Sequence, residues 1–349
     1  MTDSVEVGFW EQSGADRLIE ALPSEFDLAD GMPNTDVVLR SVSGETVVSR
    51  LYEAFRGGSG TAVHLLGQLC GILVLCAVWK KYRTSIRGDE DDLFSHCVTL
   101  VLALTGFGAL IRLFADAADY FSSIHTSVTA ALTTLTALTA MRGAVQSAAV
   151  SGMGMALFLS VMETVCTAVL YPFLRVCTGL SLASAVGGGE GLSQISGVLR
   201  KQFLWLIGAV MMLLCAVLSY QTVLARASDS VALRAVKFSL SGVIPIIGGA
   251  VGEAASTVAA GISLTAKTVG VLGIAAVLWQ ILPTLCMVYL TKLTFSISAA
   301  MASFLGMTRE GTVLEECSSL AGFLLAVCCA SAVMYVLMIT LCMNGGGTS

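Results

Sequence analysis

The stretch LAGFLLAVCCASAVMYVLMITLCM, residues Leu320–Met343, decides the fold of this chain. It holds no charged residue, and it is longer than the roughly 20 apolar residues that a helix needs to cross the roughly 30 Å hydrocarbon core of a bilayer. Toward the N-terminus, as far as Thr61, similar apolar segments dotted with Gly, Ala and Thr follow one another. The sequence therefore predicts an all-α, polytopic helical membrane protein with about 6–8 transmembrane or re-entrant helices.

The composition supports this class. Mean hydropathy is +0.84, and 56% of the residues are hydrophobic. Only 12% are charged, against about 25% in a typical soluble domain. So few polar groups cannot cover a globular surface, and the lipid bilayer is the expected surrounding.

Charge divides the chain into unequal parts. Residues 1–60 hold eleven acids and four arginines, a net charge of −7, which leaves +2 for the remainder of a chain whose total is −5. We expect residues 1–60 to be a short helical, acidic, extracytoplasmic segment, 61–343 the membrane domain, and 344–349 a flexible tail. Anionic partners would repel the acidic segment, so nucleic acid is not expected, and a protein partner or plain solvation is favoured.

Seven apolar segments are the expected membrane helices, the sixth of them short. They are Thr61–Trp79, Leu93–Phe114, Ala148–Phe173, Phe203–Gln221, Val269–Leu290, Leu293–Leu305 and Leu320–Met343. Glycines 57 and 58 are expected to end the helical pattern that precedes the first span.

The Thr-rich stretch Ala115–Val145, between the second and third spans, has a helical pattern that is polar on one side. This side carries Asp116, Asp119, Thr126, Thr129, Thr133 and Thr136. It could face water, another helix or a shallow interface, and a helix-packing face is the preferred interpretation over a pore lining.

Basic residues predict the orientation. Lys80, Lys81, Arg83 and Arg87 follow the first span, and such clusters usually stay in the cytoplasm. The acidic N-terminal segment is therefore placed outside. Arg175, Arg200 and Lys201 are expected to mark the loop after the third span as cytoplasmic as well. Met1 is not followed by a basic region and an apolar core. Either the chain starts after a removed signal peptide, or its first span carries the N-terminal segment across the membrane.

From Tyr220 to Lys267 the pattern changes. A polar helix with Arg234 and Lys237 precedes an apolar segment with Pro245, Gly248 and Gly249. Proline and glycine break a helix, and free backbone groups at membrane depth need protein or a water-filled cavity to satisfy them. We expect a re-entrant or broken helix pair here.

This part of the sequence resembles the stage III sporulation protein AE family. The order of elements carries the resemblance over about residues 135–343: a polar segment with a Ser/Thr-Asp turn, a basic step, an I-P-x-x-G element, an acidic Ala/Ser helix and a lysine. Pro283 and the run SISAAMASFLG, residues 296–306, are similar to the family as well. The positions that match are Asp229, Arg234, Lys237, Phe238, Ile244, Pro245, Gly248, Glu253 and Lys267.

The resemblance implies a component of a secretion-like complex made during spore formation, in the mother-cell membrane that surrounds the forespore. The implied partners are a secretion-type ATPase, small membrane subunits and ring-forming proteins of the intermembrane space. A homo- or hetero-oligomer is implied, acting as a channel between the two cells.

No enzyme motif is present. The sequence has no GxxxxGK[ST] loop, no HExxH and no GxSxG. The eleven cysteines form no CxxC pair and the three histidines lie far apart, so neither a metal nor a cofactor is expected, and no catalytic residue is assigned.

Glu163 is the foremost candidate among single residues, because an ionisable group at the centre of a span costs about 2.5–3.5 kcal/mol unless it faces protein or water. Its alternative role is a hydrogen-bonded contact between helices. Gln280, near Pro283, is treated in the same way.

The element from Pro245 to Glu253 is a candidate gate, because Gly248 and Gly252 would allow a helix to approach closely. A plain packing notch is an equal alternative.

Two function classes remain. The first is a non-enzymatic subunit of a sporulation transenvelope channel or secretion-like complex. The alternative is a secondary transporter for a small solute, with the broken helix near Pro245 as its site and Glu163 as the proton-coupling group. An inverted repeat would favour the transporter, and none is evident, because residues 243–252 have no counterpart in the first half.

Overall fold

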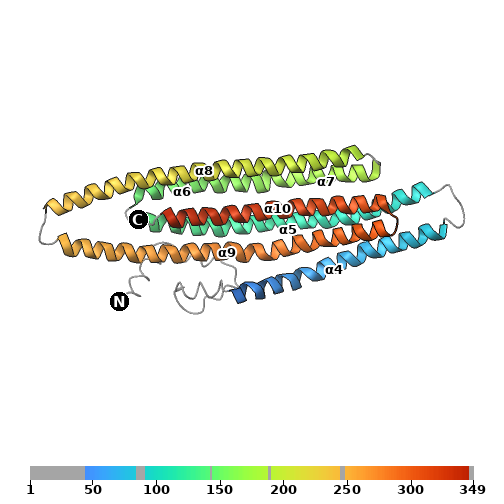
Figure 1. Cartoon of the computed structure of the whole chain (residues 1–349), viewed down its shortest axis with the longest axis horizontal. Coiled ribbons are helices and arrows are strands. Elements are labelled where there is room, and N and C mark those ends of the chain that lie inside the picture. Colours follow the sequence, from blue (N-terminus) through green and yellow to red (C-terminus); the bar gives the residue numbers. More distant parts are fainter. Residues whose placement is uncertain (1–43, 84–90, 142–143, 188–189, 244–247, 346–349) are drawn as a thin grey trace.

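A computed structural model of the chain describes residues 44–83, 91–141, 144–187, 190–243 and 248–345. Apart from short turns these residues are all helical, which confirms the predicted all-α class. In chain order the elements are α4 (Gly44–Arg83), α5 (Asp91–Met141), α6 (Val145–Glu163), the π-helix η1 (Thr164–Val169), α7 (Leu170–Gly187), α8 (Glu190–Val243), α9 (Gly248–Phe304) and α10 (Thr308–Gly345) (Figure 1).

Six helical stretches of the described chain are long and apolar enough to span a membrane, which agrees with the predicted range. They are Val48–Trp79, His96–Met141, Val145–Ser184, Gln194–Gln221, Thr265–Phe304 and Thr308–Met343. The expected separate spans Val269–Leu290 and Leu293–Leu305 are parts of one helix, α9. Pro283 lies inside α9 without ending it, because neighbouring groups in a helical membrane protein can satisfy the carbonyl that a proline frees.

Several helices are much longer than a bilayer is thick. Helices α5, α8 and α9 contain 51, 54 and 57 residues, or about 75–85 Å at about 1.5 Å per residue. Helix α8 continues without a break to Val243, and α9 starts at Gly248. Near these ends both helices extend past α5 and α10 (Figure 1). Where a re-entrant or broken helix pair was expected, the structure has the ends of two long helices, while Pro245 lies outside the described residues.

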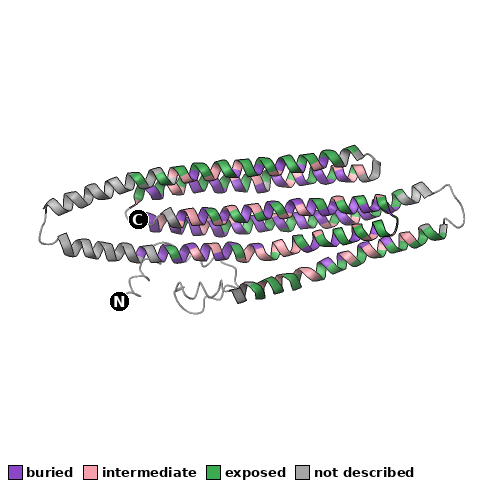
Figure 2. Cartoon of the chain, viewed as in Figure 1, coloured by how far each residue is buried: buried purple, intermediate pink, exposed green. Residues whose placement is uncertain are grey.

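Helices α5 and α10 lie at the middle of the bundle, with α8 and the α6–α7 rod on one side and α9 and α4 on the other (Figure 1). Buried residues gather on the sides of the helices that face one another and exposed residues on the outer sides, whereas α4 is mostly exposed (Figure 2). The largest fully buried side chains include Phe158, Phe295 and Tyr335. One continuous apolar core therefore joins the helices.

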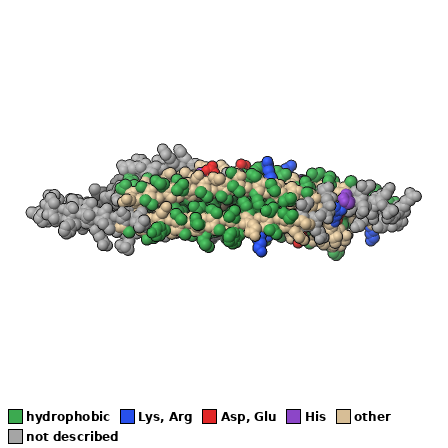
Figure 3. All heavy atoms as spheres, turned by 90° about the horizontal axis from the view of Figure 1, so that it is seen from above, with side chains coloured by type: hydrophobic (Ala, Val, Ile, Leu, Met, Phe, Trp, Pro, Cys, Tyr) green, Lys and Arg blue, Asp and Glu red, His purple; other side chains and the backbone are tan. Residues whose placement is uncertain are grey.

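The outer surface is apolar as well. On the face formed by α8, α6 and α7, hydrophobic side chains dominate, and few charged ones interrupt them (Figure 3). Trp205, Met212 and Tyr220 of α8 are 72%, 75% and 70% exposed. Trp and Tyr are enriched at the two membrane interfaces. We take the α8 segment between Trp205 and Tyr220 as the lipid-facing belt of α8.

Glycines allow α9 to approach its neighbours closely. Helix α4 runs through Gly57 and Gly58, contrary to the expected interruption. A Cβ atom at Gly58 would lie 3.1 Å from Leu290 Cδ1 of α9. The glycine is retained inside the helix because it permits this contact, which follows the small-residue rule for membrane helices.

The Thr-rich stretch belongs to α5 and does not form a separate element. Its hydroxyl groups donate to carbonyl oxygens of the preceding turn, Thr126 to Ser122 at 3.0 Å and Thr129 to His125 at 2.7 Å. Because each hydroxyl is satisfied within its own helix, threonine does not interrupt α5.

Candidate functional site

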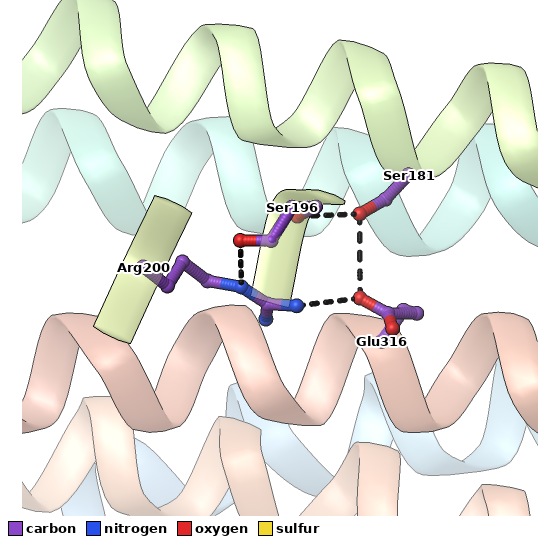
Figure 4. Close-up of polar contacts among 4 residues, drawn as sticks. All are labelled: Ser181, Ser196, Arg200 and Glu316. Atoms are coloured by element: carbon purple, nitrogen blue, oxygen red, sulfur yellow. Dashed lines mark hydrogen bonds and ion pairs between the residues drawn. The ribbon is translucent and has the colours of Figure 1, made fainter. Parts of the chain in front are cut away.

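A buried ion pair joins α8 to α10. The guanidinium Nη2 of Arg200 lies 2.8 Å from Glu316 Oε2, and the two side chains are 7% and 26% exposed (Figure 4). The expectation that Arg175, Arg200 and Lys201 lie in a loop was therefore wrong, since Arg175 lies within α7 and the other two within α8, with the Arg200 side chain turned into the bundle. A buried charge needs an opposite charge nearby, and Glu316 supplies it.

Two serines complete this cluster, which we call the Arg200 cluster (Arg200, Glu316, Ser181 and Ser196). Arg200 Nε donates to the carbonyl oxygen of Ser196 at 3.2 Å. The Ser181 hydroxyl lies 3.4 Å from both Glu316 Oε2 and the Ser196 hydroxyl (Figure 4). Arg200 Nη1 is buried with no hydrogen-bond partner in the described chain.

The Arg200 cluster connects three helices, because Ser181 lies on α7, Arg200 and Ser196 on α8, and Glu316 on α10. Its charges neutralise each other, and its hydrogen bonds and ion pair hold the three helices together. Sequence reasoning missed Glu316, which is 116 positions from Arg200. The available signal was a pair of opposite charges in two apolar segments, since membrane charges usually pair.

Glu163 lies at a change of helix type. It is the last residue of α6, and η1 follows it directly. Pro172, shortly after η1, cannot donate a backbone hydrogen bond. The Glu163 side chain is 57% exposed, with Oε2 3.7 Å from His125 Nε2 of α5. It therefore borders the outside of the bundle, not a central site.

Gln280 ties α9 to α5. Its Nε2 donates to the Ser127 hydroxyl at 2.6 Å, while its Oε1 is buried without a hydrogen-bond partner in the described chain. This geometry matches the predicted contact between helices. Pro283, one turn further on, and Lys267 are exposed.

For the remaining candidate residues from the sequence, the structure gives only the helix to which each belongs. Arg234 and Lys237 belong to α8, whereas Gly248, Gly249, Gly252 and Glu253 belong to the first turns of α9. Their side chains and Pro245 lie outside the described residues. The gate at Pro245–Glu253 accordingly stays a prediction.

Helix α5 has a polar outer surface. Among the predicted polar residues Thr129 and Thr136 are half-buried, whereas Asp116, Asp119, Thr126 and Thr133 are exposed. No described helix covers these four, so the expectation of a packing face within the chain is not met for them. With three further exposed residues of α5 they form what we call the α5 polar face: Arg112, Asp116, Asp119, Ser122, Ser123, Thr126 and Thr133.

The charges of the α5 polar face are not paired within the described chain. No ion pair there involves Arg112, Asp116 or Asp119. Nor do the described residues contain a group of three or more His, Cys, Asp or Glu side chains that could hold a metal ion. The arrangement offers a charged surface on a membrane helix, which needs water or a polar partner.

Comparisons with known proteins point to one family. The family model described as stage III sporulation protein AE matches residues 39–346. The chain is 22% identical over 290 residues to the stage III sporulation protein AE of Bacillus subtilis (strain 168), covering 81% of this chain and 71% of that protein. No solved structure matches the chain. The family match extends further toward the N-terminus than the resemblance noted over residues 135–343.

Proposed function

The chain belongs to the stage III sporulation protein AE family, and from this premise we propose that it is a non-enzymatic membrane subunit of a sporulation channel or secretion-like complex. In this proposal the complex links the mother cell to the forespore, and the chain sits in the mother-cell membrane that surrounds the forespore. The family name and the six membrane-spanning helices support the coarser statement, a multi-pass membrane protein of sporulation.

The observation that carries the role of a subunit is the uncovered α5 polar face. Arg112, Asp116 and Asp119 project from a membrane helix with no ion-pair partner in the described chain. Each charge facing lipid near the centre of a bilayer costs about 2.5–3.5 kcal/mol. A chain that functioned alone in lipid would bear this cost in full, whereas an assembly covers or hydrates the face.

The transporter alternative has less support. A proton-coupling carboxyl in such proteins faces a central cavity between helices. Glu163 instead lies at the outside of the bundle, 57% exposed, beside His125. Of the buried charged residues, Arg200 pairs with Glu316 across helices, and Glu310, 4% exposed, accepts a hydrogen bond from the Thr99 hydroxyl at 3.3 Å.

The positions of the helix ends support one orientation of the chain in the membrane. Lys81 lies at the end of α4, and the ends of α7 and α9 lie at the same end of the bundle (Figure 1). If basic residues hold this end in the cytoplasm, the extended ends of α8 and α9 project on the opposite side with the acidic N-terminal segment. Arg234, Lys237 and Glu253 then belong to a projection that is positioned to meet the ring-forming proteins of the intermembrane space.

Co-purification tests the proposal. A tagged full-length chain, isolated in mild detergent from sporulating cells, is expected to recover the secretion-type ATPase, small membrane subunits and the ring-forming proteins. The same tag on an unrelated six-helix membrane protein is the control. A chain recovered alone that takes up solute when reconstituted in liposomes would overturn the proposal in favour of the transporter.

A further inference from the structure

The α5 polar face lies at the depth of the lipid-facing belt of α8. Gly106 of α5 is level with Cys317 of α10, since a Cβ on this glycine would lie 3.1 Å from Cys317 Sγ. At the other end, a Cβ on Gly273 of α9 would contact both Ala131 of α5 and Ile339 of α10. Residues 106–131 of α5 therefore run beside residues 317–339 of α10.

The part of α10 between residues 317 and 339 also lies beside the lipid-facing belt of α8. Phe203 of α8 packs on Phe323 with ring centroids 5.8 Å apart, and Cys215 Sγ lies 3.6 Å from Met334 Sδ. Arg112 through Thr126 consequently occupy the depth at which α8 exposes Trp205 to Tyr220 to lipid. The polar side of α5 is thus a membrane surface, and not part of an aqueous domain.

The exposed positions of α5 recur with the spacing of a helix pair. Alternate steps of four and three residues connect Gly108, Arg112, Ala115, Asp119, Ser122 and Thr126, all of which are exposed. This 3.5-residue period is the pattern of two helices packed along their length. Four of the six side chains are small, and a Cβ at Gly108 would meet nothing within 4 Å in the described chain. Small residues let membrane helices approach closely.

The charges on this face complement a second copy of the same face. All copies insert in the membrane with the same orientation, so two α5 helices related by a two-fold axis along the membrane normal run parallel. Arg112 and Asp116 are four residues apart, which is about 6 Å along a helix. An arginine side chain spans that offset, so Arg112 of each copy reaches Asp116 of the other, and two ion pairs form at once.

We propose that the α5 polar face is the contact between two copies of this chain, packed α5 to α5 within the membrane, with Arg112 and Asp116 paired between copies. The inference rests on the proposed role as an assembly subunit and names one of its partners. Asp119 lies at the centre of the repeat, so each Asp119 carboxylate faces that of the other copy. Their repulsion weakens the contact and keeps water in it.

Exchange of charge between copies tests the contact. Two full-length chains with different tags are expressed together in bacterial membranes that lack other sporulation proteins, and recovery of one tag with the other is measured in mild detergent. Copies that both carry Arg112→Asp have carboxylates at both position 112 and position 116, and copies that both carry Asp116→Arg have guanidinium groups at both positions. We expect each to lower recovery by about tenfold or more.

Mixing one Arg112→Asp copy with one Asp116→Arg copy restores both pairs, and recovery is expected to return to within about twofold of the unmodified chain. Repair within a single chain cannot give this result, because neither copy carries both changes. Recovery no better than in the single-variant homodimers, or unaffected by either change, would overturn the proposal. Asp119→Asn is expected to raise recovery, and a fall would count against the contact.

A second measurement uses no charge variant, so it still tests the contact when a charge variant fails to fold. A photoreactive amino acid at Ser123 of the otherwise unmodified chain is expected to give a product of doubled mass that contains both tags. The matched control is Met212, an exposed position on a different helix, α8, which should give no such product. Products with lipid alone, or with a different polypeptide, would contradict the α5 to α5 contact.

The outcomes also separate this inference from the proposed function. If the α5 to α5 contact is not found but the sporulation partners are still recovered, only the inferred contact between two copies is overturned. An intact contact without any sporulation partner would instead overturn the proposed function.

Discussion

Arg200 and Glu316 form an ion pair of 2.8 Å between α8 and α10, in a part of the bundle where Arg200 is almost fully buried. Charge in a low-dielectric interior is stable only beside its partner, so each residue requires the other. The Arg200 cluster therefore acts as a tie that fixes how α8 and α7 lie against α10.

Glu316→Ala should lower the free energy of unfolding by about 3 kcal/mol, because it leaves the Arg200 guanidinium buried and unpaired. The partial exposure of Glu316 keeps this value at the lower end of the range for buried pairs. The measurement is thermal unfolding of the purified chain in detergent. The neighbouring Glu315→Ala is the matched control, since Glu315 is exposed, and equal destabilisation by both changes would rule out the tie.

Glu163→Gln should leave folding and assembly unchanged, because the contact with His125 is long, at 3.7 Å, and the carboxylate is 57% exposed. Exposed pairs of this kind contribute about 1 kcal/mol or less. Co-purification of the complex and forespore gene activity are the two measurements. Normal assembly with lost forespore gene activity would instead assign Glu163 a role in conduction.

Ser127→Ala should destabilise the chain by about 1–2 kcal/mol, because the buried Gln280 amide loses the hydroxyl that accepts its hydrogen bond at 2.6 Å. The double change Ser127→Ala with Gln280→Leu should cost less than Ser127→Ala alone, since no unpaired polar group then remains. Unfolding in denaturant gives both values. A double change that costs the full sum of the two single changes would show that the hydrogen bond does not couple them.

Gly273→Leu should destabilise the bundle by about 1–3 kcal/mol through overpacking. Even the first added carbon would lie 3.0 Å from Ala131 Cβ of α5, and that atom cannot move without its backbone. Gly208→Leu on α8 is the control, because nothing lies within 4 Å of a Cβ there. Similar melting temperatures for the two variants would contradict the close approach of α9 and α5.

The orientation predicts labelling from one side. In intact, non-sporulating bacterial cells that carry the chain in their plasma membrane, a membrane-impermeant thiol reagent should react with Lys267→Cys, at the edge of the span Thr265–Phe304 that is nearer the start of α9, and spare Lys81→Cys at the other end. Both positions are exposed. The unmodified chain with its eleven cysteines supplies the background to subtract. The reverse labelling pattern would place the N-terminal segment in the cytoplasm.

Some of the fold could be read from local pattern and some could not. The apolar stretch Leu320–Met343 predicted a membrane helix, and the structure contains it within α10. The joining of Val269–Leu290 to Leu293–Leu305 in α9 was missed, because the polar residues Thr291 and Lys292 separate the two apolar segments in the sequence. A contact between helices was one of the two roles expected for Gln280, but its partner Ser127, 153 positions away, was not predicted.

The sequence by itself determined the class of the protein, because the cost of placing backbone and charge in lipid depends on each segment alone and shows in its composition. It also determined the family through the order of its elements. Only the tertiary structure decided that Arg200 pairs with Glu316, that Glu163 lies at the outside, and that no described helix covers the α5 polar face. These features depend on which helix lies beside which, and that choice is made by packing between residues far apart in the chain.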